Sequence, residues 1–454
     1  MTRALCFCLP TWSRALCFAV VYESRSTAPI LRIPDELVVE IVDAADYPAE
    51  LTVSHVCRSL RQTVVNASTL WTDVVVNVNR DGSVEISKLY IERSAPRQIR
   101  LTLNAVSDLQ PQSLRVLTPN CVDRIVELYI QFQSCQAVET IMHALRGVAV
   151  PSLEYLSIKS ACKGYNNDPV VDLSGLDAPS IVSLRLDRCI FGRNIPPWMR
   201  TSLTDLTLID SVALHDTNSW AFLFGPSSPP LQSLTSLYLD WSIGVNYYSD
   251  RLDRVIHSTS LTHLSLEFYS DHENAVLNAL TALHLPALTH LIIHGSHGDN
   301  ISAICNSGSV SLGVNIPSLT SLTLANIYAC GKDLECSEDR EYKPITRRPL
   351  PHIFSSLSTL TLIKQCFTAD ILRELFGPNS QSCFGRLERI EVWPLYVEID
   401  SVYEALQGLV RNWNSERVPV LVMPPHLCQR EGWKEDQVEL WWNLEEYRVK
   451  DSDE

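Results

Sequence analysis

A short apolar pattern that recurs along most of the chain limits what this sequence can fold into. An apolar residue is followed by two variable residues, Leu, one variable residue, and then Leu or Ile, and ten such copies start 22 to 38 residues apart. The final apolar residues alternate with variable ones, which predicts a strand with one buried face. Because a lone strand cannot bury that face, neighbouring copies must stack. The copies begin at Ile125, Leu153, Ile181, Leu203, Leu234, Leu261, Leu288, Leu319, Leu357 and Leu387, and a weaker one begins at Ile99.

The intervals between copies have the features of helices and turns. Residues 137–147, 273–285 and 369–376 each place apolar side chains on one helical face, and Pro or Ser often precedes the next strand. The repeat resembles the leucine-rich repeat family, whose unit spans about 20–29 residues. This resemblance implies an α/β solenoid, a horseshoe with a parallel inner sheet and outer helices.

The sequence departs from that family just after the strand, where the family usually has Asn or Cys. Cys189 fits this place, whereas Ser211, Ser242 and Ser296 occupy it in other copies. A hydroxyl makes a weaker ladder between copies than an Asn amide, which has both a donor and an acceptor. We therefore expect the curvature of this solenoid to be less regular than that of a leucine-rich repeat protein with a full ladder of Asn residues.

A different pattern precedes the repeats, in residues 31–71. Pro34 suits the first position of a helix, and a second and a third short helix are predicted from Pro48 and over about residues 57–66. The unit has roughly 40 residues, which is near the lower limit for independent folding. We expect it to pack against a partner or against the first repeats.

This segment resembles the F-box, whose outline is LPxELLxxI, then VCRxWR, then xLW. The matching stretches are 33–37 with Ile41, 56–61, and 70–71, and the departures are Ile33 for Leu and Leu60 for Trp. With its repeats, the chain resembles a fungal-type F-box protein with leucine-rich repeats. The resemblance implies a substrate receptor of an SCF ubiquitin ligase, in which the F-box binds the Skp adaptor, and through it cullin, while the repeats bind a target protein. The implied adaptor-binding residues are Ile33, Pro34, Leu37, Ile41, Val56, Cys57, Leu60 and Trp71.

Two other interpretations of these residues remain open. The apolar residues of the N-terminal unit are also expected if it is a helical cap on the solenoid, since repeat arrays need capped ends. The whole chain would then be a protein-binding scaffold without a ubiquitin role.

The variable residues between the inward leucines are the candidates for binding a target protein. Several are acidic or aromatic, and aromatic residues among charges are typical of interface hot spots. We expect an acidic, partly aromatic concave patch for a basic segment of a partner, with a solvated sheet face as the alternative. The candidate residues are Asp187, Asp205, Tyr238, Asp240, Trp241, His263, Glu267 and His290.

Composition and missing motifs exclude several other functions. Lys and Arg number 37 against 52 Asp and Glu, a net charge of −15, which disfavours nucleic acid and anionic membrane surfaces as partners. No catalytic signature occurs, so we predict no enzyme activity, no cofactor and no metal site. The spacing of His290, His294 and His297 suits metal ligands on a helix, but the surrounding pattern predicts a strand. The 14 cysteines include no CxxC, which favours buried thiols and a cytoplasmic or nuclear location.

The chain therefore divides into four predicted parts. Residues 1–29 are an apolar leader that we expect to be disordered, 30–75 the F-box-like module, 97–394 the solenoid, and 395–454 a C-terminal cap. In the cap we expect a helix over 401–413, a strand over 418–423 and a helix over 433–447. The charged interval 328–350 is either a binding loop or a linker.

Overall fold

The structure is a computed structural model that describes the repeats and the helices preceding them. The described residues are 32–45, 48–77, 80, 82–105, 117–161, 170–191, 196–209, 231–241, 256–268, 283–294, 315–325, 354–363, 386–393, 402, 404–406, 420–423 and 438–440. The predicted leader, the 328–350 interval, the 369–376 helix and most of the 273–285 helix lie outside these residues, as do Ser211, Ser242 and Ser296.

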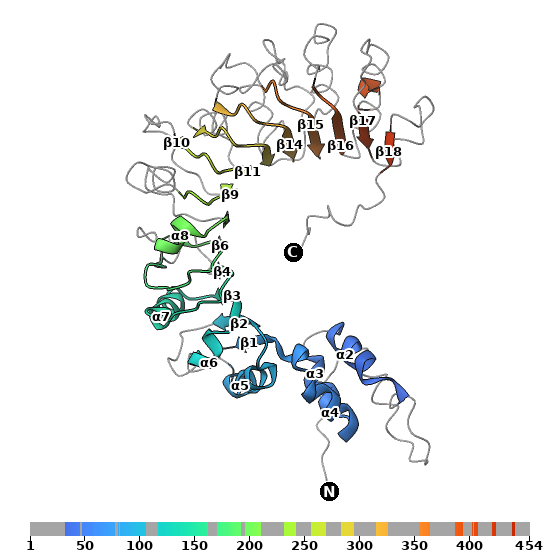
Figure 1. Cartoon of the computed structure of the whole chain (residues 1–454), viewed down its shortest axis with the longest axis vertical. Helices are drawn as coiled ribbons and strands as arrows, with labels where there is room; N and C mark the ends of the chain where they lie inside the picture. Colours follow the sequence, from blue (N-terminus) through green and yellow to red (C-terminus); the bar gives the residue numbers. More distant parts are fainter. Residues whose placement is uncertain are drawn as a thin grey trace, which may run out of the picture.

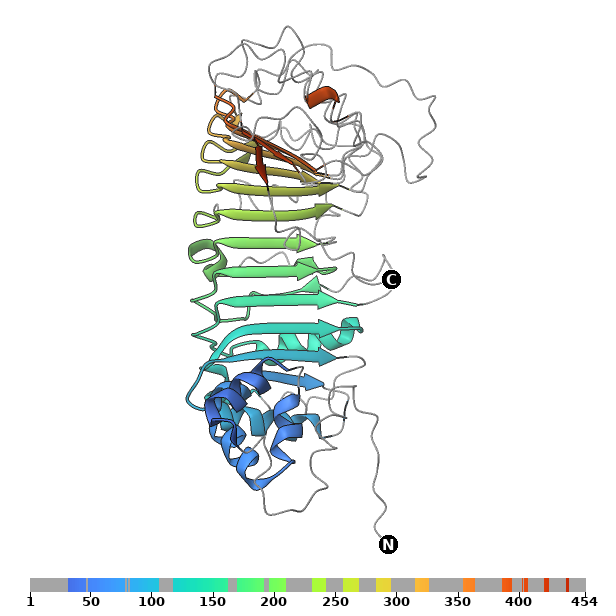
Figure 2. The ribbon, with the colours of Figure 1, turned by 90° about the vertical axis from the view of Figure 1, so that its right-hand side faces the viewer.

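One sheet of 14 parallel strands runs through the described part of the chain and curves into an arc (Figures 1 and 2). Each strand pairs with the strand of the next copy, so the sheet follows the order of the sequence. The ten predicted copies and the weaker one are all strands of this sheet, which confirms the α/β solenoid with a parallel inner sheet. The strands are β1 (Asp73–Asn77), β2 (Ile99–Ala105), β3 (Ile125–Phe132), β4 (Tyr155–Ser160), β6 (Ser183–Asp187), β8 (Asp205–Ile209), β9 (Ser236–Trp241), β11 (His263–Phe268), β13 (His290–His294), β14 (Ser321–Ala325), β15 (Thr359–Ile363), β16 (Arg389–Trp393), β17 (Val420–Met423) and β18 (Val438–Leu440).

The strand register aligns the leucines of successive copies into buried rows. Leu206 of β8 pairs with Leu237 of β9, which pairs with Leu264 of β11, and Leu264 with Leu291 of β13. All four are almost completely buried. Because side chains alternate across a strand, the intervening residues point to the opposite, concave face. The core therefore lies between the sheet and the outer layer.

The outer layer carries short helices and two small sheets. Its described helices are α5 (Ser83–Ser94), α6 (Pro119–Val122), α7 (Cys135–Leu145) and α8 (Pro197–Thr201), and the small sheets pair β5 (Val170–Val171) with β7 (Ile190–Phe191) and β10 (Ile256–His257) with β12 (Leu283–His284). Figure 1 shows α7 and α8 on the convex side of the arc. Helix α7 confirms the prediction for 137–147, and Gly147 beyond its end has a φ of 74°, a conformation that favours glycine.

A row of hydroxyl side chains crosses the chain just before six of the strands and was not predicted. Each hydroxyl lies within hydrogen-bonding distance of a backbone carbonyl of the preceding copy, as in Thr262 Oγ1 to Thr235 O at 3.0 Å and Thr320 Oγ1 to Thr289 O at 3.1 Å, and Thr204 Oγ1 also donates to the Asp205 carboxylate at 2.6 Å. At the predicted post-strand position, the buried Cys189 thiol lies 3.7 Å from the Ile158 carbonyl oxygen of the preceding copy and 3.2 Å from the Asp187 carbonyl oxygen of its own copy. The hydroxyl row consists of Thr204, Thr235, Thr262, Thr289, Thr320 and Ser358.

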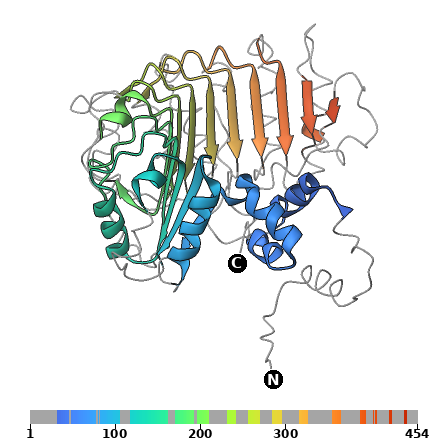
Figure 3. The same cartoon turned by 60° about the horizontal axis from the view of Figure 1, so that its bottom comes forward.

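Three short helices precede the sheet, as the sequence predicted, and pack beside its first strand (Figure 3). They are α2 (Asp35–Asp43), α3 (Ala49–Ser54) and α4 (Arg58–Asn66), followed by the 3-10 turn η3 (Ser68–Trp71). Trp71 is fully buried, donates its indole N–H to the Val64 carbonyl at 2.9 Å, and meets Tyr90 of α5 edge-on with ring centroids 4.9 Å apart. The helical unit and the first repeat therefore share one core.

The solenoid extends beyond its predicted limits at both ends. Strand β1 starts at Asp73, inside the predicted 30–75 module, and pairs with β2, because Val74 and Val76 have the same buried alternation as the later copies. At the other end, the predicted strand over 418–423 is present as β17, whereas the predicted 433–447 helix contains the strand β18, which continues the sheet. No helix in the described ranges is long and apolar enough to cross a membrane.

Candidate protein-interaction surfaces

Helix α2 exposes two large apolar side chains while burying two others. Leu37 and Ile41 are 47% and 58% exposed, whereas Val38 and Val42 are only 6% and 4% exposed. Since residues four apart lie on one helical face, Leu37 and Ile41 form a single exposed stripe next to the buried one. We call Leu37 and Ile41 the α2 stripe. Exposed apolar pairs of this kind mark candidate contacts with another protein.

The α2 stripe sits on a helix that the rest of the chain holds in place. The Thr63 hydroxyl of α4 donates to Asp35 in the first turn of α2 at 2.7 Å. Buried Glu50 of α3 accepts a hydrogen bond from the Tyr90 hydroxyl of α5, which ties the helices to the first repeat. The surface is therefore already ordered before a partner binds, and binding would cost little conformational entropy in this helix.

The other predicted adaptor-binding residues divide into two groups. Pro34 is exposed, while Ile33, Val56 and Cys57 are half-buried and pack partly against the core. Leu60 and Trp71 are buried, so their side chains stabilise the helical unit rather than offering a contact surface. The prediction that these last two contact an adaptor is corrected by their burial.

The concave face bears the other predicted contacts, and the register shows how they align. Asp240 pairs with Glu267, as expected from the alternation, but Ile209 pairs with Asp187 and interrupts the predicted row of carboxylates. Asp205 lies at the start of its strand, next to Ser236, in a different row. The side chains of Asp240 and Trp241 lie outside the described residues.

Asp187 is buried, which corrects its predicted place on an exposed face. Its carboxylate is 3.6 Å from the Lys159 ammonium, and the residue is only 6% exposed. Burial raises the pKa of Asp187, and nearby Lys159, Arg185 and Arg188 act in the opposite direction. This carboxylate is paired with the half-exposed Lys159 side chain and is not part of an open acidic patch.

Half-buried and exposed polar side chains cover the centre of the concave face. The Tyr238 hydroxyl donates to Glu267 of the neighbouring strand. Glu267 in turn pairs with His294, whose pKa is lowered by burial although Glu267 raises it. The imidazole rings of His263 and His290 stack with centroids 4.3 Å apart. Of the eight predicted substrate contacts, Tyr238, Glu267, His263 and His290 are thus brought together on neighbouring strands.

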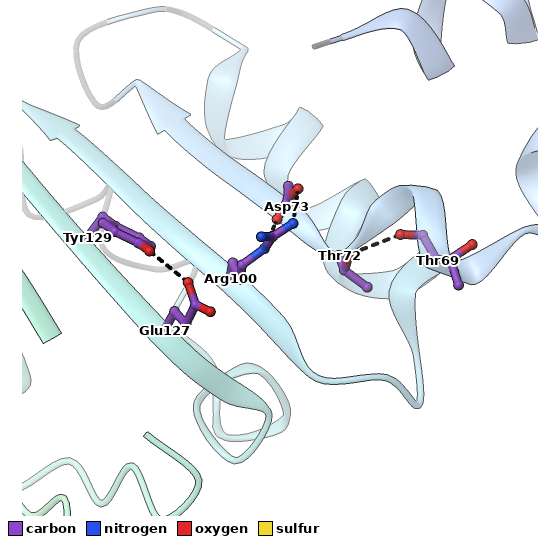
Figure 4. Close-up of polar contacts among 6 residues, drawn as sticks. All are labelled: Thr69, Thr72, Asp73, Arg100, Glu127 and Tyr129. Carbon is purple, nitrogen blue, oxygen red and sulfur yellow. Dashed lines mark hydrogen bonds and ion pairs between the residues drawn. The ribbon is translucent and has the colours of Figure 1, made fainter. Parts of the chain in front are cut away.

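A second polar group lies at the start of the sheet and was not predicted, because it joins β3 to β2, a weak copy, and to β1, which lies before the first predicted copy. Arg100 of β2 binds Asp73 of β1 through two nitrogens, and the Tyr129 hydroxyl donates to Glu127 of β3 at 2.7 Å (Figure 4). Burial and the Glu127 carboxylate raise the pKa of Tyr129 to about 12. The Tyr129 ring also lies 5.3 Å from that of Tyr155.

An open cavity of about 540 Å³ adjoins this group where the helical unit meets the sheet. Both charge signs line it, because Arg97 and Arg100 face the same space as Glu127. The guanidinium of Arg100 is already bound by Asp73, and Arg97 donates from Nε to Ser68 at 2.8 Å. The cavity is therefore nearly neutral and its arginines are engaged within the chain. Its lining residues are Thr69, Thr72, Arg97, Gln98, Ile99, Arg100, Val126 and Glu127.

Comparisons with known proteins find similar chains among solved structures. No family model matches the chain, and no curated protein does. The crystal structure of a TLR13–ssRNA13 complex contains a similar chain, with 15% sequence identity and a TM-score of 0.32. The match covers 72% of this chain and 35% of the other, so this chain spans about a third of the length of its neighbour. The leucine-rich-repeat-like arrangement itself follows from the parallel sheet and its rows of buried leucines.

Proposed function

We propose that this chain is the substrate-recognition subunit of an SCF-type ubiquitin ligase. The helical unit binds the Skp adaptor, and through it cullin, while the concave face of the solenoid binds a target protein. The α2 stripe is the observation that carries this proposal, because it is an exposed apolar surface on a helix that the chain holds rigid. A leucine-rich-repeat-like solenoid supplies the extended protein-binding surface.

The gain from covering the α2 stripe is large enough to matter for binding. Burying a whole Leu or Ile side chain contributes about 1.5–3 kcal/mol, and roughly half of each side chain is exposed here. Covering both therefore contributes about 2 kcal/mol in total, which is a substantial share of a micromolar interaction of about 8 kcal/mol. Residues of this kind act as anchors at the centre of an interface.

The target-binding part of the proposal rests on the centre of the concave face. Tyr238, Glu267, His263 and His290 lie on β9, β11 and β13, and the whole chain carries a net charge of −15. An extended basic segment of a target protein complements such a surface. This role also requires the chain to be in the cytoplasm or nucleus, where reduced thiols such as those of Cys57 and Cys121 persist.

The adaptor contact is tested by placing a charge on the α2 stripe. Leu37→Asp and Ile41→Asp should each weaken binding of the purified Skp adaptor about a hundredfold, because they remove apolar contact and bury an unpaired carboxylate. Ile86→Asp is the matched control, since Ile86 is 42% exposed on a different helix, α5. Binding is measured by titration calorimetry, and thermal unfolding confirms that all three variants fold.

Two results would decide against the adaptor role. Unchanged adaptor affinity of both α2 variants would show that the stripe is not the contact. Failure of the wild-type chain to bind the adaptor would leave the alternative, a leucine-rich-repeat scaffold that binds proteins without a ubiquitin role. The solenoid and its protein-binding surface are common to both functions.

A further inference from the structure

Strands β4 and β6 lie side by side in the sheet (Figure 1), and three cationic residues lie toward their ends. Lys159 is next to last in β4, Arg185 lies in β6, and Arg188 directly follows β6. The Lys159 side chain is 55% exposed, and both arginines are exposed. By the strand alternation, Lys159 and Arg185 point to the concave face. We call these three residues the cationic patch.

The cationic patch surrounds a single carboxylate, and that carboxylate is buried. Asp187 is the register partner of Lys159, and its Oδ2 lies 3.6 Å from the Lys159 Nζ. Burial raises the pKa of Asp187, whereas Lys159, Arg185 and Arg188 all lower it, so the three cations lie near this one group. Three cations against one carboxylate leave a net charge of +2 here, although the whole chain carries −15.

The carboxylates of the flanking strands do not neutralise this charge. Glu127 of β3 and Asp205 of β8 share the register row of Tyr155, the first residue of β4. Four residues along a strand separate that row from Lys159, a distance of about 13 Å. Each of the two carboxylates also accepts a hydrogen bond from a nearby hydroxyl.

Two features of the arginines favour a role outside the fold itself. The Arg185 guanidinium forms no hydrogen bond and no direct ion pair with the described residues. Arg188 has a φ of 53°, a backbone conformation that residues other than glycine rarely adopt, and its N–H donates to the Ile209 carbonyl at 2.8 Å. Glycine would adopt this conformation at a lower cost, so an arginine at this position favours a function for its side chain.

We propose that the cationic patch binds an acidic segment of the target protein, a run of Asp and Glu side chains laid across β4 and β6. This inference rests on the target-binding role of the concave face proposed above. Several carboxylates fit better than one phosphate group, because the cations are spread over two strands about 4.8 Å apart and do not surround one point. The buried Asp187 carboxylate would also repel a dianionic phosphate.

The position of the patch predicts how the target's charges are spaced. The basic segment of the target is assigned to the centre of the concave face, where Glu267 lies on β11. The sheet order β4, β6, β8, β9, β11 puts four strand spacings, about 19 Å, between the strands of Lys159 and Glu267. An extended chain advances about 3.3 Å per residue, so acidic residues of the target should lie about six positions from its basic residues.

The test is a selection of random dodecapeptides displayed on phage, with the purified full chain and no adaptor. The net charge of −15 favours basic peptides elsewhere on the surface, so acidic peptides report on the cationic patch. The wild type should enrich peptides with clustered Asp and Glu residues, and Lys159→Gln/Arg185→Gln should lose this enrichment. The matched control is Lys88→Gln/Arg146→Gln, which removes the same charge from two exposed residues of the outer layer, on α5 and just after α7.

Affinities are then measured by fluorescence anisotropy with one enriched acidic peptide, labelled with fluorescein. Lys159→Gln/Arg185→Gln should bind it about tenfold more weakly, since two exposed ion pairs contribute roughly threefold each. Asp187→Asn should bind it about threefold more tightly, because the one negative charge of the group is removed. A role of these residues in packing alone would not produce tighter binding, and thermal unfolding confirms that each variant folds.

Three results would overturn the proposal. The wild type may enrich no acidic peptides, the Lys159→Gln/Arg185→Gln variant could enrich them equally, or Asp187→Asn could fail to strengthen binding. Tighter binding of a peptide with one phosphoserine in place of the acidic run would identify a phosphate site instead. Because no adaptor is present, loss of Skp binding in the calorimetric test would remove the ubiquitin-ligase role and leave these results unaffected.

Discussion

The hydroxyl row predicts a defined loss of stability when its members are replaced by valine. Thr235 and Thr320 are the cleanest positions, because serines and not histidines follow them in the sequence. Their hydroxyls donate to the carbonyls of Thr204 and Thr289 at 3.2 and 3.1 Å. Valine keeps the branched shape that suits a strand and removes only the hydrogen bond.

The expected magnitude follows from how crowded each acceptor is. A typical intramolecular hydrogen bond contributes about 0.5–1.5 kcal/mol. The Thr204 carbonyl also accepts from the backbone N–H groups of Thr235 and Ser236, both at 2.9 Å, so the hydroxyl is a third donor to one oxygen. We therefore expect each substitution to lower the free energy of unfolding by about 0.5 kcal/mol, at the low end of that range. The loss should be larger at half-buried Thr320 than at exposed Thr235.

The two sites should act independently. Strands β9 and β14 are separated by β11 and β13, which places the substitutions about 14 Å apart and beyond the range of coupling. The double variant should lose about 1 kcal/mol in the free energy of unfolding. Because repeat arrays do not always unfold in one step, amide hydrogen exchange in β9 and β14 gives the local value, an acceleration of about twofold at each strand.

Serine variants separate the hydrogen bond from the methyl group. Thr235→Ser and Thr320→Ser keep the hydroxyl and should exchange more slowly than the valine variants. If valine is tolerated as well as threonine, or if serine is the worse replacement at both positions, the hydroxyl row contributes no stability and the reasoning fails.

Three further predictions concern buried groups. Trp71→Phe leaves the buried Val64 carbonyl without its indole donor and should lower the free energy of unfolding by about 2 kcal/mol, and an unchanged melting temperature would contradict this. Burial raises the pKa of Asp187 above 3.8, so the ionised carboxylate destabilises the folded state, and this cost disappears as the pH falls through the raised pKa. Asp187→Asn should therefore gain most stability over the wild type at neutral pH, and the gain should shrink on acidification. A difference in urea midpoints that does not change with pH would refute this. Burial also raises the pKa of Cys121 to about 11, so iodoacetamide at pH 8 should modify half-buried Cys57 and spare Cys121, as mass spectrometry can show.

The strands of the solenoid could be predicted from the sequence because their period is local. Alternation such as that of Leu237 and Leu239 fixes which side chains are buried, and stacking then fixes the parallel sheet. The same alternation is present in Val74 and Val76 of β1, but the leading leucine of the repeat is missing there, so the repeat pattern does not predict this strand. The sequence also shows that a threonine follows the first leucine in several copies, as in Leu261-Thr262 and Leu288-Thr289. It does not show the hydrogen bond of that threonine, because the acceptor lies in another copy.

The exposure of individual site residues could not be read from alternation. By its place in the strand alternation, Asp187 should be exposed. It is the last residue of its strand, however, and its register partners on the two neighbouring strands, Lys159 and Ile209, lie beside it and leave it buried. The stacking of His263 on His290 likewise depends on register, which the spacing of the copies does not determine. Contacts between copies are set by the tertiary arrangement and therefore needed the structure.

Helix α2 shows why an apolar helix pattern alone cannot separate a core from a binding surface. At 100° per residue, the stripe of Leu37 and Ile41 lies about 100° from the stripe of Val38 and Val42. The chain covers the valine stripe with α3 and α4, and this is sufficient to hold a nine-residue helix. A helix needed only as a cap would gain from polar residues at the second position, since capping units present a polar outer face. Two large apolar side chains kept there, each about half exposed, therefore favour a docking surface over a cap.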